Sequence, residues 1–93
     1  MSIKTEGVRL LVRDVLQTFS EPYGEDIIED VFVAIENNAE WHRRYVELSN
    51  ETNRWVVNNW IGKYTKAITG LKSLREVTAK RSDLIKDYTK LRP

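Results

Sequence analysis

The chain has 93 residues, of which 41% are hydrophobic and 10% aromatic, and it contains no cysteine. This length predicts one domain spanning residues 1–93, with a hydrophobic core, and excludes a second domain of ordinary size. The lack of cysteine excludes disulfides, thiol catalysis and cysteine-ligated metal sites, so we expect an intracellular protein located in the cytoplasm.

The net charge of +1 hides an uneven distribution of charge along the chain. Residues 1–62 hold six Lys and Arg against eleven Asp and Glu, whereas residues 63–93 hold nine against three. The basic part is suited to nucleic acid, and it is equally suited to the acidic part of the same chain or of a second copy. Charges interrupt the apolar positions of residues 1–15, so we expect neither a signal peptide nor a membrane span.

The first predicted element is an amphipathic helix, because apolar residues near the N-terminus recur with helical spacing. These are Val8, Leu11, Val12, Val15, Leu16 and Phe19. Pro22 and Gly24 then predict a turn. A second helix follows at about 25–36, with Glu25 and Asp26 placed in its first turn, where the exposed N–H groups favour negative charge. Its apolar face is Ile27, Ile28, Val31, Phe32 and Ile35.

A third helix is predicted at about 39–48. Asn37 and Glu40 have the spacing of a capping box, so one helix ends and the next begins within about two residues. The only histidine, His42, lies off the apolar stripe and is expected to be a solvated side chain. The stripe itself consists of Trp41, Tyr45 and Leu48.

After a polar connector at 49–53, a fourth helix is predicted at 54–69, ended by Gly70 in a left-handed conformation. Its expected core face is Val57, Trp60, Ile61, Tyr64 and Ile68. Its expected polar face is Trp55, Asn58, Asn59, Gly62, Lys66 and Thr69, with Lys63 at the edge. No acidic residue occurs between positions 53 and 70, although glutamate is readily accommodated on an exposed helix face.

Residues 71–80 fit either an extended arm or a weak helix. Ser82 is suited to cap a last helix, whose apolar residues are Leu84, Ile85, Tyr88 and Leu91. The sequence therefore predicts an all-α fold, a compact bundle of four to five short helices.

Candidate catalytic and metal-binding residues are few. A single histidine, no cysteine and no glycine-rich loop predict that the protein is not an enzyme and needs no cofactor. The carboxylates of residues 21–30 lack the loop that calcium sites use, so no metal site is expected. We interpret the acidic helix at 25–36 as a solvated face or as a docking face for a protein partner.

The acid-free face of the fourth helix is suited to a DNA groove. Asparagine offers a donor and an acceptor to adenine, lysine neutralises phosphates, and Gly62 permits close approach to the DNA. The same face could instead be only solvated, with Trp55 packed beneath the C-terminal segment, or it could meet a protein.

The third helix, the polar connector and the fourth helix together resemble the helix-turn-helix unit of DNA-binding proteins, over about thirty residues. The resemblance implies that helix 54–69 is the recognition helix of a small transcriptional or replication regulator, acting in the major groove and as a dimer. Self-association would use the first helix or the terminal apolar stripe. The alternative is a protein-interaction module, an adaptor or inhibitor, that uses the acidic helix and the basic C-terminal segment. The DNA contacts implied by the resemblance are Arg54, Trp55, Asn58, Asn59, Lys63 and Lys66, supported by Lys72, Arg75, Lys80 and Arg81.

Overall fold

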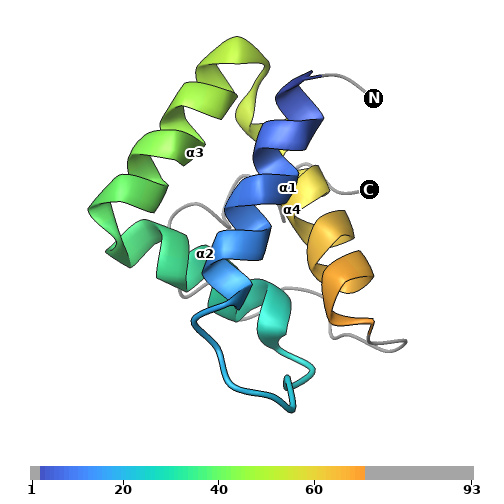
Figure 1. Ribbon diagram of the computed structural model, residues 1–93. Coiled ribbons are helices and arrows are strands. Elements are labelled where there is room, and N and C mark those ends of the chain that lie inside the picture. The colour runs from blue at the N-terminus through green and yellow to red at the C-terminus, as the bar shows by residue number, and fades with distance from the viewer. Residues whose placement is uncertain (1–2, 71–93) are drawn as a thin grey trace.

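The computed structural model describes residues 3–70, which form four α-helices and no strand (Figure 1). The helices are α1 (Ile3–Leu16), α2 (Ile27–Asn37), α3 (Ala39–Glu51) and α4 (Arg54–Thr69). The all-α bundle predicted from the sequence is confirmed. The predictions for residues 71–80 and for a last helix after Ser82 lie outside the described residues.

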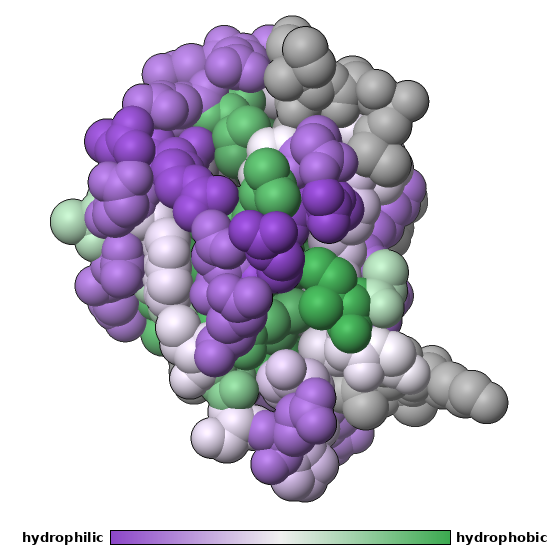
Figure 2. Space-filling view, in the orientation of Figure 1, coloured by the Kyte–Doolittle hydropathy of each residue, from purple (hydrophilic) through white to green (hydrophobic). Residues whose placement is uncertain are grey.

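The helix α1 lies against the other three helices and packs most extensively against α4. In Figure 1 it crosses the front of the bundle, with α3 on one side and α4 on the other. Hydrophilic side chains cover most of this face, and hydrophobic ones show mainly between the helices (Figure 2). This arrangement buries the apolar stripe of α1 and leaves residues such as Arg13 on its outward side, as an amphipathic helix requires.

The predicted apolar stripes of α1 and α2 form most of the core. All their members are buried except Phe19, which is partly buried and packs against the same cluster. From α3, Tyr45 is buried, whereas Trp41 and Leu48 pack against the core from its margin. Burying one large apolar side chain contributes about 1.5–3 kcal/mol, so these stripes supply the main driving force for folding.

The ends of the helices differ from the sequence-based predictions in three places. The N-cap of α3 is Asn38, whose side chain accepts a hydrogen bond from Trp41 N at 3.0 Å, so the capping box assigned to Asn37 is wrong. Because α3 continues to Glu51, the connector to α4 is two residues long rather than five. The helix α2 begins at Ile27, so Glu25 and Asp26 precede it instead of lying in its first turn.

Both ends of α4 are fixed by local interactions. The Asn53 side chain accepts a hydrogen bond from Val56 N at 2.9 Å, as an N-cap does. Gly70 ends the helix with a φ of 69°, and its N–H donates to Lys66 O at 3.0 Å. The predicted left-handed glycine cap is therefore confirmed. Within residues 3–70, no helix is long and apolar enough to cross a membrane.

Candidate nucleic-acid interface

The helix α4 is turned about its axis relative to the sequence-based prediction. Of its expected core residues, Val57, Ile61 and Tyr64 are buried as predicted, but Ile68 is 41% exposed. Two members of the expected polar face, Asn58 and Gly62, are buried instead. The buried side of α4 therefore includes polar and small residues as well as its apolar stripe.

Asn58 belongs to a buried polar network and is not on the surface. The Tyr45 hydroxyl donates to Asn58 Oδ1 at 2.6 Å, and Arg54 Nε donates to the Tyr45 hydroxyl at 3.4 Å. Because the Asn58 side chain is fully buried, it cannot reach a DNA base while the bundle is folded. The prediction that Asn58 contacts DNA is therefore wrong, and the residue instead joins α3 to α4.

Burial also affects the ionisation of this network. Burial of the Tyr45 hydroxyl raises its pKa above the usual tyrosine value, and the nearby Arg54 guanidinium opposes this rise in part. Tyr45 is therefore neutral at physiological pH and acts as the hydrogen-bond donor to Asn58.

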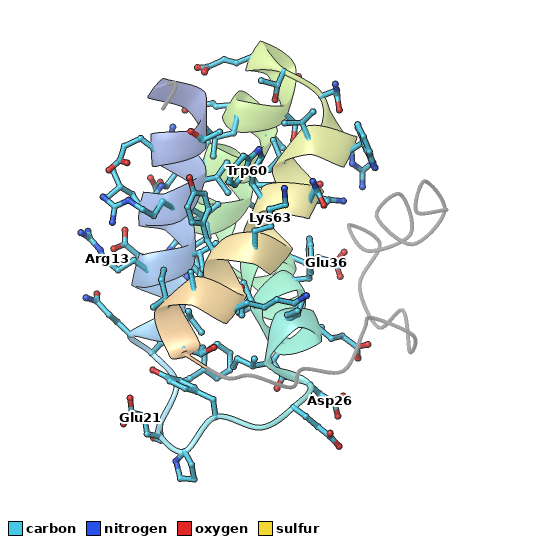
Figure 3. The ribbon with its side chains drawn as sticks, turned by 90° about the vertical axis from the view of Figure 1, so that its right-hand side faces the viewer. Arg13, Glu21, Asp26, Glu36, Trp60 and Lys63 are labelled. Carbon is cyan, nitrogen blue, oxygen red and sulfur yellow. The ribbon has the colours of Figure 1, made fainter. Side chains whose placement is uncertain are left out.

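One stripe of α4 stays on the surface, and we call it the outer face of α4. Its members follow one another at helical spacing and are at least partly exposed, namely Asn59, Trp60, Lys63, Lys66 and Ala67. Trp60 and Lys63 project from α4 toward the viewer in Figure 3, whereas Arg13 points away from them on the α1 side. Two of the predicted DNA contacts, Lys63 and Lys66, thus lie together on one surface with Asn59.

Aromatic contacts shape the middle of the outer face. The rings of Trp60 and Tyr64 stack with their centroids 5.2 Å apart, and Lys63 Nζ lies 4.7 Å from the centroid of the Trp60 ring. A cation over an indole ring is attracted by the ring's negative face. Trp60 was expected in the core, but it is half-buried and helps to position Lys63.

The N-terminal end of α4 carries the other two predicted contacts. Trp55 is 44% exposed, which confirms its predicted accessibility. Arg54 is also exposed, although its Nε is engaged with Tyr45. The remaining predicted contacts, Lys72, Arg75, Lys80 and Arg81, lie outside the described residues.

The arginines of α1 and α3 form ion pairs, whereas the lysines of α4 form none within residues 3–70. Arg9 pairs with Glu6 and Arg13 with Asp14, while Arg43 pairs with Glu40 and Glu47, and Arg44 Nη1 lies 2.9 Å from Asp14 Oδ2. Within residues 3–70, neither lysine of α4 forms an ion pair. The positive charges of Lys63 and Lys66 are therefore not neutralised by a neighbouring carboxylate in this part of the chain.

The acidic residues around α2 are engaged within the protein. Glu29 is only 6% exposed, and none of Glu25, Asp26, Glu29, Asp30 and Glu36 is without an interaction partner. Across residues 3–70, no three potential metal ligands come together. The expectation of an entirely solvated acidic face does not hold for Glu29.

The outer face also contains residues that sequence reasoning missed. Trp60 and Ala67 were not assigned to it, because hydropathy alone placed the large indole in the core. The spacing of Trp60 and Lys63, one helical turn apart on an acid-free helix, is the signal that could have indicated their contact.

Comparison of the chain with protein-family models found no matching family, and comparisons with curated proteins and with solved structures found no match. The resemblance to helix-turn-helix proteins therefore stays a prediction from the sequence.

Proposed function

We propose that the protein binds DNA through the outer face of α4. The observation that carries this proposal is the pair of exposed lysines, Lys63 and Lys66, which have no carboxylate partner in the described part of the chain and lie on a helix without acidic residues. Lysines of this kind can replace the counterions condensed on DNA, which is the main source of sequence-independent affinity.

The order of the elements supports a helix-turn-helix mode of binding. The helices α3 and α4 pack together and follow one another in the chain, although the two residues that join them, Thr52 and Asn53, are fewer than the three or four of the usual turn. In this mode α4 would enter the major groove, where Asn59 is the side chain suited to a base edge. Lys63 and Lys66 would contact phosphates, and Trp55 would pack beside the backbone at the N-terminal end of α4.

The small size of the outer face of α4 limits how specifically one copy of the protein could recognise a DNA sequence. One asparagine and two lysines make few base contacts, so a regulator of transcription or replication built this way would need two copies reading two half-sites. The apolar stripe of α1 is buried within the bundle and therefore does not serve self-association. The proposed dimer must use other surfaces.

The alternative of a protein-interaction module has less support. Its docking face was the acidic helix at 25–36, where each acidic residue has an interaction within the protein and Glu29 is only 6% exposed. An adaptor or inhibitor of this type would also leave unexplained the lysines of α4, which form no ion pair within residues 3–70. An intracellular site of action, expected from the cysteine-free sequence, agrees with DNA binding and stays a prediction.

The test is the salt dependence of binding to a random-sequence duplex, measured by fluorescence anisotropy. The variant Lys63→Gln/Lys66→Gln should weaken binding and reduce the slope of log K against log[salt] by about 1.8, because each phosphate contact contributes about 0.9. The control Arg13→Gln/Arg43→Gln removes the same number of charges from α1 and α3 and should leave the slope unchanged.

The control is demanding, because it frees carboxylates that the arginines had neutralised. If net charge alone governed binding, Arg13→Gln/Arg43→Gln would weaken DNA binding as much as the lysine variant does, because both variants lose two positive charges. Equal effects of the two variants would contradict the proposal, as would the absence of binding by wild type at about 50 mM salt.

A further inference from the structure

The surface of α4 around Asn59 indicates which base pairs the protein would read. Of the two asparagines of this helix, Asn58 is buried and accepts a hydrogen bond from Tyr45, whereas Asn59 is partly exposed. Within residues 3–70 the Asn59 amide forms no hydrogen bond. An asparagine amide carries a donor and an acceptor side by side, so both groups of Asn59 are left for a ligand.

A valine lies next to Asn59 on this surface. Val56 is three positions earlier in the helix, and side chains with this spacing are neighbours. It is partly exposed, although the adjacent Val57 belongs to the core. The surface around Asn59 therefore presents methyl groups beside an amide.

An A·T base pair presents the matching set of groups in the major groove. Adenine N7 accepts and adenine N6 donates, so asparagine can bind both at once, and thymine carries a C5-methyl group that apolar side chains contact. A G·C pair has no methyl group, and guanine presents two acceptors there, which suit the paired donors of an arginine. An amide beside valine methyl groups therefore fits an A·T pair better than a G·C pair.

The side chains that read G·C pairs are missing from α4 or engaged elsewhere. The helix has no carboxylate to accept from cytosine N4, and its one arginine, Arg54, donates from Nε to the Tyr45 hydroxyl at 3.4 Å. Lys63 Nζ lies 4.7 Å from the centroid of the Trp60 ring, and Figure 3 shows the two side chains together. In the proposed binding mode the N-terminal residues of the helix contact the bases, whereas Lys66 is in its last turn.

We propose that Asn59 and Val56 give the protein a preference for A·T pairs in the major groove. The Asn59 amide hydrogen-bonds to adenine N6 and N7, and the Val56 methyl groups contact the methyl group of thymine in the same or the next base pair. This inference rests on the proposed DNA binding, and it adds the class of base pair that α4 recognises.

The test compares the binding of wild type to four duplexes of equal length by fluorescence anisotropy. One has only A·T pairs and one only G·C pairs, while the other two are the A·T duplex with uracil in place of thymine or 7-deazaadenine in place of adenine. The A·T duplex should bind about tenfold more tightly than the G·C duplex. Uracil, which lacks only the methyl group, should weaken binding about threefold. 7-Deazaadenine, which lacks the N7 acceptor, should weaken it about fivefold.

Three variants assign these effects to side chains. Asn59→Ala should remove most of the preference for A·T pairs and make binding insensitive to 7-deazaadenine, and Val56→Ala should reduce the effect of uracil. The matched control is Asn50→Ala, which removes an exposed amide from α3 and should leave all four affinities unchanged. Circular dichroism reports whether each variant is folded, and the comparison of duplexes with wild type needs no variant.

Two results would overturn this inference and leave the proposed DNA binding intact. The first is equal affinity of wild type for the A·T and G·C duplexes, with binding that still depends on Lys63 and Lys66. The second is a preference for A·T pairs that uracil, 7-deazaadenine and Asn59→Ala all leave unchanged, which would show that the shape of the DNA is read instead. No binding to any of the duplexes would overturn both proposals.

Discussion

The Tyr45 hydroxyl of α3 donates a hydrogen bond to Asn58 Oδ1 of α4 at 2.6 Å, and both side chains are almost completely buried. This hydrogen bond fixes the rotation of α4 against α3. With Asn58 turned inward, Lys63 and Lys66 are on the exposed side of the helix. A buried polar contact therefore determines which residues of α4 form its outer face.

The coupling between these two residues can be measured. Asn58→Ala should lower the free energy of unfolding by about 2–3 kcal/mol and Tyr45→Phe by about 1–2 kcal/mol, because each leaves a buried partner unsatisfied. The double variant should lose less than the sum by about 1 kcal/mol, since the second substitution breaks a bond that is already lost. Urea denaturation provides these values. Strict additivity would show that the two side chains do not interact.

The ion pair between Asp14 and Arg44 predicts a pH dependence of stability. Hydrogen bonding from Arg44 holds the pKa of the Asp14 carboxyl below its ordinary value. A lowered pKa in the folded state gives stability that is present above about pH 4 and is lost as the pH falls through the folded-state pKa. Asp14→Asn should therefore cost about 0.5–1 kcal/mol at pH 7, and this cost should disappear near pH 2.

Thermal denaturation of wild type and Asp14→Asn between pH 2 and 7 measures this difference. Arg43→Gln is a suitable control, because its pairs with Glu40 and Glu47 are more exposed and should contribute less. A cost of Asp14→Asn that is the same at every pH would show that its effect is not electrostatic.

The exposure of Trp55 predicts the quenching of tryptophan fluorescence. Trp55 is 44% exposed, whereas Trp41 and Trp60 pack against the core. Trp55→Phe should remove most of the readily quenched emission. Acrylamide is the quencher of choice, because Lys63 beside Trp60 would attract iodide. If Trp55→Phe leaves the quenching curve unchanged, another tryptophan is the accessible one.

The left-handed conformation of Gly70 at the end of α4 predicts that a substitution there lowers the stability of the protein. Its φ of 69° is unfavourable for residues with a Cβ, so Gly70→Ala should destabilise the protein by about 1 kcal/mol. The control is Gly24→Ala, since a Cβ at Gly24 would meet no atom within 4 Å. Urea denaturation compares the two variants, and equal stabilities would contradict the assigned cap.

The sequence predicted the core residues of α1 and α2 well, because the buried apolar residues of these helices follow the helical spacing. Their apolar spacing therefore translates directly into core positions. The same reasoning failed for α4, because this helix buries polar residues that find partners inside the protein. Asn58, for example, is buried and accepts a hydrogen bond from the Tyr45 hydroxyl of α3 at 2.6 Å. Hydropathy assigns such residues to the surface, because it cannot register a partner on another helix.

The sequence predicted the exposed lysines of the candidate site but misplaced the asparagine Asn58. The absence of acid from residues 53–70 directed attention to α4, and Lys63 and Lys66 are exposed as expected. Asn58 was misplaced because its partner, Tyr45, lies thirteen positions earlier in the chain.

Mapping the DNA contact on the protein tests the central claim most directly. Adding a short random-sequence duplex to 15N-labelled protein at about 50 mM salt should shift or broaden the amide signals of Asn59, Lys63, Lys66 and Ala67 in a saturable way. The signals of Arg43 and Glu47, on the exposed side of α3, should stay in place. Saturable changes centred on α2 or α3, or no changes at all, would contradict the proposal that the outer face of α4 binds DNA.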